Sequence, residues 1–498
     1  MTPAPWDSVS PADQHFVLIT GANSGVGLGI CQRLINDFLH HHPLDAHLIL
    51  IPTTRSPTKS RETVLSLRRH LESVARSSPA LRRRAVAESP EHDYIWTDSF
   101  RRVHILSPQL DLCDIPDVYG LAARLVKGTV SNPPDADGMA DVLTNVRVPR
   151  LDAVIFNAGF GGWTGFSFLG AMKAFLTAGI VAAVTWPEFK IDTVGAVVPG
   201  RSGKATAERM AAGMEKQDNA VLGAVFCSNV FGHYVLGHAL LPLLAREPGD
   251  AVRPGKIIWT SSIEASPAHF RLDDLQGVTG RGSYESSKRL TDILALTATL
   301  PGVRPYSASY FRVPRGRDDE KGGEETVEIE EDLRPRTYVS HPGVFVSTLF
   351  PVPFFLLWAY RIALFVARWL GSPWHNVDAY KASTSSAWLA LEAPDVLVES
   401  GAEKTKWGSA CDRLGRPVVK ATEVEGWGWD GRVDGGRRRG FAHERGVLSR
   451  RRGRRPGAVE LTQEEREKFE ILGADCWKEM ERLRAKWEAR LGVKAVGK

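Results

Sequence analysis

Short apolar runs alternate along this chain with segments whose apolar residues recur every third or fourth position. The runs at 16–19, 47–51, 102–110, 151–156, 256–262 and 337–340 have the composition of buried parallel strands, and the segments between several of them have the spacing of amphipathic helices. This alternation predicts an α/β fold, in which helices flank a doubly wound parallel sheet. The polar residues 77–100 interrupt the pattern and predict a loop.

The first run leads directly into a glycine-rich turn and then a helical pattern. In this context the turn binds a pyrophosphate, because the helix N-terminus offers unpaired N–H groups and the positive end of its dipole. Gly21 permits the tight turn, Gly25 lets the backbone approach the ligand, and Gly27 allows close strand–helix packing. Taken alone, such a turn fits a purely structural role equally well. The residues expected to contact a dinucleotide here are Gly21, Asn23, Ser24, Gly25, Val26 and Gly27.

The end of the second run carries cations where an acidic residue would select NADH. Thr54 and Arg55 follow the strand, and Lys59 stands four residues further on. Cationic groups at this position favour the 2′-phosphate of the adenosine ribose, so we expect NADPH as the cofactor. The alternative is that Arg55 and Lys59 are ordinary surface cations.

A third group of residues has the chemistry of ketone reduction. The run 256–262 ends in two serines, and Tyr284 and Lys288 then stand four residues apart, on one face of a helix. A phenol has a pKa near 10, and a neighbouring ammonium lowers it toward the working range of a proton donor. We therefore expect Tyr284 to donate a proton to a carbonyl oxygen that Ser262 positions by a hydrogen bond.

Together, these motifs resemble those of the short-chain dehydrogenase/reductase family, which has a Rossmann fold. The resemblance includes T-G-x-x-x-G-x-G at 20–27, N-A-G at 157–159, N-x-x-G-H at 229–233 and P-G-x-x-x-x-T at 342–348. It implies that Lys288 also holds the nicotinamide ribose, and that Asn229 stabilises a helix kink and holds a proton-relay water. The further cofactor contacts that it implies are Asp111 beside the adenine, Asn157, Ala158 and Gly159 behind the cofactor, and Val344, Ser347 and Thr348 on the nicotinamide side.

Several local strings are similar to one branch, the fungal 3-keto-steroid reductases of sterol synthesis. They are IWTSS at 258–262, LDDLQ at 272–276 and YESSK at 284–288, and the likeness covers 16–348 and, more loosely, 407–424. This implies reduction of a 4-methyl sterone to the 3β-hydroxysterol by NADPH, after C4 decarboxylation in ergosterol formation. It also implies a complex with a C4 methyl oxidase, a C4 decarboxylase and a tethering protein, on the cytosolic face of the endoplasmic reticulum or on lipid droplets.

Other functions remain open at this point. Another member of the same family could act on 17-keto steroids, retinoids or lipid ketones, since the catalytic residues do not distinguish these substrates. A non-catalytic scaffold of the sterol complex would have no physical need for Ser262, Tyr284 and Lys288 together. A nucleic-acid-associated regulator would rest only on the arginines at 432–455, which fit a solvated tail better, so we expect no nucleic acid.

Two strongly apolar segments interrupt the expected domain. Residues 166–184 could span a membrane by length, but Lys173 and the need to return to the same sheet favour a substrate-channel or membrane-facing insertion. Residues 349–369 are apolar and aromatic, with Arg361 and Arg368 seven positions apart and therefore on one helix face, where they could snorkel. We expect a substrate lid that dips into a membrane; the alternative is a buried helix.

The composition sets the domain boundaries. The 498 residues are 43% hydrophobic and 24% charged, which is typical of a globular chain, and the net charge is +5. The five cysteines stand singly without metal-ligand spacing, so we expect no metal and a reducing compartment, and the N-terminus has no signal-peptide pattern. The expected parts are an N-terminal tail at 1–15, a catalytic domain at 16–424, a Gly/Arg-rich disordered linker at 425–457 and a C-terminal helix within 458–498. We expect two insertions in the catalytic domain, at about 160–215 and at 303–336, and the second is expected to be an acidic solvated loop. The C-terminal helix is expected to begin with the capping box at Thr462.

Overall fold

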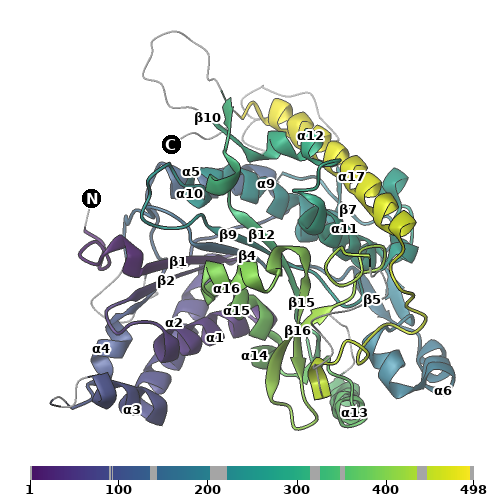
Figure 1. Cartoon of the computed structure of the whole chain (residues 1–498), viewed down its shortest axis with the longest axis horizontal. Helices are drawn as coiled ribbons and strands as arrows, with labels where there is room; N and C mark the ends of the chain where they lie inside the picture. Colours follow the sequence, from purple (N-terminus) through teal and green to yellow (C-terminus); the bar gives the residue numbers. More distant parts are fainter. Residues whose placement is uncertain are drawn as a thin grey trace.

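The computed structural model describes residues 3–88, 91, 93–134, 143–201, 221–314, 326–347, 354–433 and 446–493 (Figure 1). Its centre is an eight-stranded sheet in the order β16-β15-β12-β9-β4-β1-β2-β3, parallel except for the edge strand β16. The strands are β1 (Gln14–Ile19), β2 (His47–Pro52), β3 (Val103–Ile105), β4 (Ala153–Phe156), β9 (Lys256–Thr260), β12 (Arg336–His341), β15 (Lys406–Cys411) and β16 (Pro417–Thr422). The predicted doubly wound parallel sheet is confirmed.

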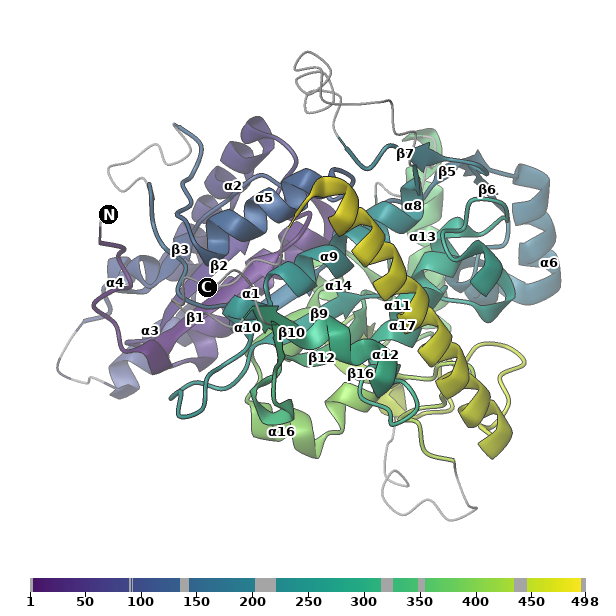
Figure 2. The same cartoon turned by 90° about the horizontal axis from the view of Figure 1, so that it is seen from above.

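Helices cover both faces of this sheet, and each face has its own hydrophobic core (Figures 1 and 2). The helices on one face are α1 (Gly25–His41), α2 (Pro57–Ser77), α14 (Ala379–Ala382), α15 (Thr384–Leu391) and α16 (Pro394–Glu399). Those on the other are α5 (Ile115–Val126), α9 (Gly232–Ala239), α10 (Leu241–Leu244) and α11 (Ser283–Thr297). The strands between them are buried on both sides, as their continuous apolar runs require.

The C-terminal helix α17 (Gln463–Leu491) packs outside α11 and α12 (Arg304–Ser307), as the yellow helix in Figure 2 shows. It begins with the predicted capping box, in which Thr462 and Glu465 bond each other's backbone N–H groups. Phe469 and Trp477 are buried and Leu483 is partly buried against the same core, so these residues hold α17 to the rest of the protein.

Two segments enlarge the carboxyl end of the sheet. Between β4 and α9 lie β5 (Trp163–Phe166), α6 (Phe168–Thr185), β6 (Lys190–Asp192), β7 (Val197–Val198), β8 (Leu222–Gly223), α8 (Ala224–Phe226) and the π-helix η2 (Cys227–Phe231). After β12 lie β13 (Val344–Phe345), η7 (Phe354–Leu356), α13 (Leu357–Trp369) and β14 (His375–Val377). The helices α6 and α13 contact each other at the side remote from α2 (Figure 1).

Some expectations about irregular segments were wrong. Residues 77–100 contain two helices, α3 (Pro79–Glu88) and α4 (Trp96–Arg101). The acidic insertion at 303–336 contains α12, η5 (Ala308–Phe311), β10 (Arg312–Pro314), β11 (Thr326–Glu328) and η6 (Glu331–Leu333), and 315–325 lie outside the described residues. Buried apolar residues such as Tyr310 and Phe311 anchor the described start of this insertion in the core. Most of the acidic, glycine-rich stretch for which a solvated loop is expected, 317–325, lies outside the described residues.

The predicted disordered linker at 425–457 is also ordered where the structure describes it, at 425–433 and 446–457. Trp427 is buried, its ring centroid lies 5.5 Å from that of Phe469, and its indole N–H donates to the Lys404 carbonyl. Farther along, the Trp374 indole donates to the Gly453 carbonyl. Contacts with buried tryptophans therefore order 425–433 and 446–457 in spite of their Gly/Arg-rich composition. Residues 434–445 lie outside the described residues.

Candidate active site

A large cavity lies at the carboxyl ends of β1, β4, β9 and β12. It has a volume of about 1140 Å³ and includes the point where the strand order reverses between β1 and β4, which is where open α/β sheets bind ligands. Single drug-sized ligands occupy pockets of roughly 300–1,000 Å³. The cavity is therefore large enough for a dinucleotide and a second large ligand.

The glycine turn at one end of the cavity fits a dinucleotide. Gly21 has φ +66°, and a Cβ atom on Gly27 would lie 2.3 Å from the Gly21 carbonyl oxygen. Asn157 locks the turn, because its side-chain amide donates to the Thr20 carbonyl at 3.0 Å. Gly25, in contrast, faces open space, and the Ser24 side chain makes no capping hydrogen bond to α1. The N–H groups of the first turn of α1 thus have no side-chain cap and are directed at a position where a pyrophosphate can bind.

The structure brings nearly all the predicted cofactor residues to this one cavity. Those that line it are Gly21, Asn23, Ser24, Gly25, Val26, Gly27, Thr54, Arg55, Lys59, Asp111, Asn157, Ala158, Gly159, Tyr284, Lys288, Val344 and Ser347. Thr348 lies outside the described residues. The Arg55 side chain is exposed beside the end of β2, where it can reach a ligand phosphate.

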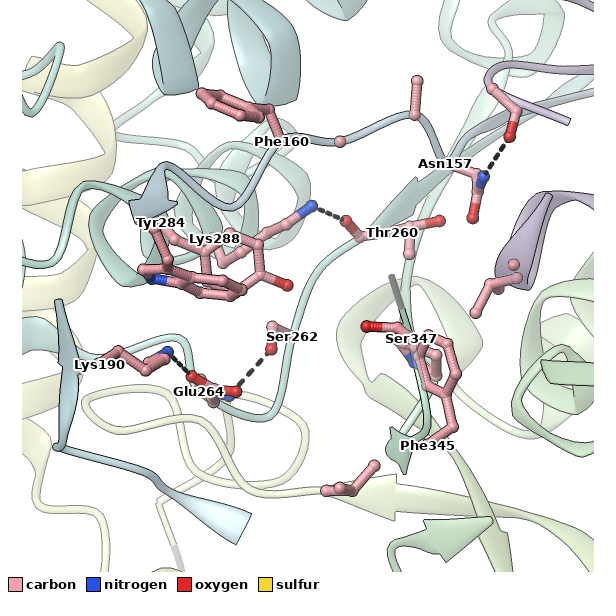
Figure 3. Close-up of a pocket in the computed structure, with 18 of the residues that line it drawn as sticks. Asn157, Phe160, Lys190, Thr260, Ser262, Glu264, Tyr284, Lys288, Phe345 and Ser347 are labelled. Atoms are coloured by element: carbon pink, nitrogen blue, oxygen red, sulfur yellow. Dashed lines mark hydrogen bonds and ion pairs between the residues drawn. The ribbon is translucent and has the colours of Figure 1, made fainter. Parts of the chain in front are cut away.

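Tyr284, Lys288 and Ser262 converge near the middle of the cavity (Figure 3). The Lys288 ammonium donates to the Thr260 carbonyl at 2.7 Å and lies 5.7 Å from the centroid of the Tyr284 ring. Burial lowers the pKa of Lys288 to about 8. The pKa of Tyr284 is raised, by burial first and by the Glu264 carboxylate second, although the Ser262 hydroxyl lowers it. Burial and Glu264 thus decide the pKa of Tyr284, so the expected lowering of this pKa toward neutral pH is wrong and the phenol stays protonated at neutral pH.

Asn229 lies behind this group and does not line the cavity. Its side-chain oxygen accepts from the Phe160 N–H at 2.7 Å, and its amide donates to the Phe160 carbonyl and to the Ser287 hydroxyl, both at 3.0 Å. It belongs to the π-helix η2, so the helix is irregular at the position where the resemblance implies a kink. The role of Asn229 in holding a relay water stays a prediction.

Two buried histidines support the core behind the site. His233 Nε2 lies 2.8 Å from the Thr20 hydroxyl, and His238 Nδ1 lies 2.8 Å from the Tyr310 carbonyl. Burial lowers the pKa of His233 to about 3 and that of His238 to about 4, so both rings are neutral supports of the core.

Four further residues next to Tyr284 were not anticipated from the sequence. They are Trp163, Lys190, Glu264 and Glu285, and all except Glu285 line the cavity. The Trp163 ring lies 4.7 Å from the Tyr284 ring, and the Lys190 ammonium forms ion pairs with both carboxylates. No local sequence signal marks Trp163 or Lys190, because they reach Tyr284 only through the fold.

The rest of the cavity wall is apolar and comes from the two segments that enlarge the sheet. Residues from α6 and its flanks include Phe168, Ala171, Met172, Phe175 and Leu176, and those from η7 and α13 include Leu356, Ala359, Tyr360 and Ala363. The segment 166–184 thus borders the cavity, as a substrate channel requires.

Both apolar helices also expose apolar surface. Among the described residues, α6 is the one helix long and apolar enough to cross a membrane, with mean hydropathy 1.7, and it contains a kink at Gly179. The expectation for α13 was partly wrong: Arg361 is exposed, but Arg368 is buried and its guanidinium lies over the Phe365 ring at 4.7 Å. The two arginines therefore do not form one snorkelling face, and α13 is neither fully buried nor fully exposed.

The cavity, the glycine turn and the Ser262–Tyr284–Lys288 group together define a nicotinamide-dependent oxidoreductase. No family model matches the chain. Among curated proteins, it is 47% identical to the 3-keto-steroid reductase ERG27 of Gibberella zeae over 99% of this chain and 98% of that one. It is 39% identical to the corresponding protein of Aspergillus fumigatus over 96% and 94% of the two chains. The protein is therefore a member of the fungal 3-keto-steroid reductase family.

Solved structures show more distant likeness. Salutaridine reductase from Papaver somniferum is 14% identical, with a TM-score of 0.38 over 76% of this chain and 97% of that one. A metagenomic short-chain oxidoreductase in complex with NADP is 16% identical, with a TM-score of 0.30 over 76% and 92% of the two chains.

Proposed function

We propose that this protein reduces a 4-methyl sterone to the 3β-hydroxysterol with NADPH, after C4 decarboxylation in ergosterol formation. The observation that carries the proposal is the continuity of one cavity, from the glycine turn past Tyr284 to the apolar wall of α6 and α13. A rigid apolar substrate with a single polar reacting group matches this arrangement, since Ser262 and Tyr284 offer hydrogen bonds to a ketone oxygen next to a wall that is mostly apolar.

The roles of the residues follow from their positions. The Tyr284 phenol donates its proton to the ketone oxygen, and the Ser262 hydroxyl donates a hydrogen bond that fixes this oxygen. The Lys288 ammonium holds the nicotinamide ribose, while the glycine turn and the N-terminus of α1 bind the pyrophosphate. Bound NADPH supplies the hydride for the carbonyl carbon. The C=O group thereby becomes CH–OH, and Tyr284 recovers its proton from solvent.

Arg55 supports NADPH as the physiological cofactor. Arg55→Glu is expected to raise the KM for NADPH by about 10- to 100-fold, because a charge-assisted hydrogen bond of roughly 1.5–3 kcal/mol is replaced by repulsion of the 2′-phosphate. The KM for NADH should change much less. Initial rates with both cofactors measure the effect, and Arg69→Glu, on an exposed face of α2, is the matched control. Equal changes for the two cofactors would contradict the role of Arg55.

A membrane surface is the proposed source of the substrate, at the cytosolic face of the endoplasmic reticulum or on lipid droplets. Leu169 and Leu176 on α6 are 75% and 81% exposed, and Trp358 on α13 is 71% exposed. Since both helices also line the cavity, a sterol could enter from lipid between them. This location would also bring the protein to the proposed complex with a C4 methyl oxidase, a C4 decarboxylase and a tethering protein.

The membrane proposal predicts a defined loss of lipid binding. Replacing Leu169, Leu176 and Trp358 with serine should reduce flotation of the full chain with liposomes by about tenfold or more, because each buried side chain contributes about 1.5–3 kcal/mol. The matched control replaces Val398, Leu414 and Ile471, which are 68%, 77% and 63% exposed on other elements, with serine. An equal loss in both triple variants would contradict a specific membrane face.

The substrate class is tested by comparing two ketones. With NADPH and detergent-solubilised protein, kcat/KM for a 4-methyl 3-keto sterol should exceed that for a 17-keto steroid by at least about 100-fold. Preference for the 17-keto steroid would keep the mechanism and overturn the substrate. Binding of NADPH without reduction of either ketone would favour the scaffold alternative.

A further inference from the structure

Three separate segments meet in a buried charged cluster beside Tyr284. The Lys190 ammonium, on β6, pairs with the carboxylate of Glu264, two residues after Ser262, and with that of Glu285, next to Tyr284 (Figure 3). The same ammonium lies 4.2 Å from the centroid of the Trp163 ring and 5.5 Å from that of the Tyr284 ring. One cation thus connects the loop that carries Ser262 with the helix that carries Tyr284.

Neighbours of Lys190 in the chain reinforce this connection. The Asp192 carboxylate accepts from the N–H of Gly282, the residue before α11, at 2.9 Å. The Trp186 indole donates to the carbonyl of Ile263, the residue after Ser262, at 3.2 Å. The segment 186–192 therefore contacts both the Ser262 loop and the start of α11 at more than one point.

The charges in the cluster depend on one another. Burial alone would lower the pKa of Lys190, but the carboxylates of Glu264 and Glu285 outweigh burial and raise it, so the amine stays charged. Burial raises the pKa of Glu264 to about 7, with Lys190 opposing the rise. Removing the amine would leave the buried carboxylate of Glu285 and the partly buried carboxylate of Glu264 without their cation, which favours protonation or movement of one of them.

We propose that Lys190 is a positioning residue for ketone reduction, which joins the Ser262 loop to the first turn of α11 and so fixes Ser262 and Tyr284 relative to the ketone oxygen. The inference rests on the proposed reductase activity and extends it to a residue outside the Ser262–Tyr284–Lys288 group. Misplacing a reacting group by about 1 Å can cost on the order of 100-fold in rate, so a contact of this kind has a measurable effect.

Steady-state kinetics of the full chain test the proposal. Lys190→Met is expected to lower kcat by about 10- to 100-fold with the dissociation constant for NADPH within about twofold of wild type, because the glycine turn is untouched. Lys190→Arg, which keeps the charge, should recover most of the rate. Lys173→Met, an exposed lysine on α6 in the same insertion, is the control and should behave as wild type. Retention of kcat within twofold in Lys190→Met, or an equal loss of NADPH binding, would overturn the proposal.

The pH dependence of the reverse reaction separates positioning from a general loss of structure. The titratable groups around Tyr284 come from four elements. Lys190 lies on β6, Glu264 follows β9, and Glu285 and Lys288 lie on α11. Tyr360 of α13 lies near the carboxylate of Glu264. Lys190 lowers the pKa of Tyr284 and Glu264 raises it. Lys190→Met should therefore move the alkaline-activated limb of alcohol oxidation to higher pH, and Glu264→Gln should move it to lower pH. Shifts in the same direction would overturn the proposal.

Hydrogen exchange gives a test that needs no substrate. If wild type reduces no 3-keto steroid, the proposed function fails, but the connection through Lys190 can still be measured. Amides of 261–264 and 283–288 should exchange faster in Glu264→Gln, a near-isosteric change, and in Lys190→Met if that variant folds, whereas amides of α1 should not change. Unchanged protection at 261–264 and 283–288 would overturn the inference by itself.

Discussion

Replacing Tyr284 by phenylalanine is expected to lower the rate of ketone reduction by about 10²- to 10⁴-fold, the usual contribution of a positioned general acid. The ring of Tyr284 packs 4.7 Å from that of Trp163, and phenylalanine keeps this ring, so folding and NADPH binding should be retained. The rate is measured by NADPH oxidation and the binding by quenching of tryptophan fluorescence. Tyr306→Phe, on the partly exposed helix α12, is the matched control. A Tyr284→Phe enzyme with more than about a tenth of the wild-type rate would show that another group donates the proton.

The same site predicts how the reduction rate depends on pH. Burial and Glu264 raise the pKa of Tyr284, so this proton donor stays protonated throughout the neutral range. Burial lowers the pKa of Lys288 to about 8, so its ammonium is charged at pH 7 and is lost as the pH rises through about 8. The reduction rate should therefore be high near neutral pH and decline above about pH 8, even though Tyr284 still carries its proton.

Replacing Gly27 by alanine is expected to cause a large loss of cofactor binding. A Cβ at this position would lie 2.3 Å from the Gly21 carbonyl oxygen and 2.6 Å from the side-chain nitrogen of Asn157, both of which form the glycine turn. Such overpacking costs about 1–3 kcal/mol, and a displaced turn cannot hold the pyrophosphate, so we expect NADPH affinity to fall by at least about tenfold to 100-fold.

Isothermal titration with NADPH and thermal melting measure the two consequences of Gly27→Ala. Gly120→Ala is the matched control, because it is also a glycine in a helix but its added Cβ would meet only the end of the Arg124 side chain at 3.8 Å. Alanine there should leave binding unchanged and raise stability slightly, by up to about 1 kcal/mol. Unchanged NADPH affinity in Gly27→Ala would contradict a cofactor site at this turn.

The parts of the site that could be predicted from the sequence are those whose chemistry is local. The glycine turn at Gly21 to Gly27 has a fixed spacing because a single strand–turn–helix unit contains all of its residues. The pair Tyr284–Lys288 has a fixed spacing because a single turn of helix brings the two side chains to one face. For the same reason, the six apolar runs that form β1, β2, β3, β4, β9 and β12, and the start of α17 at Thr462, could be predicted.

The parts that could not be predicted depend on contacts between distant positions. Lys190 pairs with Glu285 across 95 positions, and nothing in its own surroundings distinguishes it from a surface lysine. Trp427 shows the converse: its Gly/Arg-rich surroundings favour disorder, but Phe469 of α17 covers it. Arg368 was expected at a membrane face, yet it lies with Leu364 and Ala367 on the buried side of α13, which helix periodicity alone does not reveal.

Product analysis after incubation of the full chain with NADPH and a 4-methyl 3-keto sterol in detergent is the decisive test of the proposed reaction. We expect one product, the 3β-hydroxysterol, formed in equal amount to the NADPH consumed and absent with Tyr284→Phe. Oxidation of NADPH that leaves the 3-ketone intact, or no oxidation although NADPH binds, would overturn the proposed reaction.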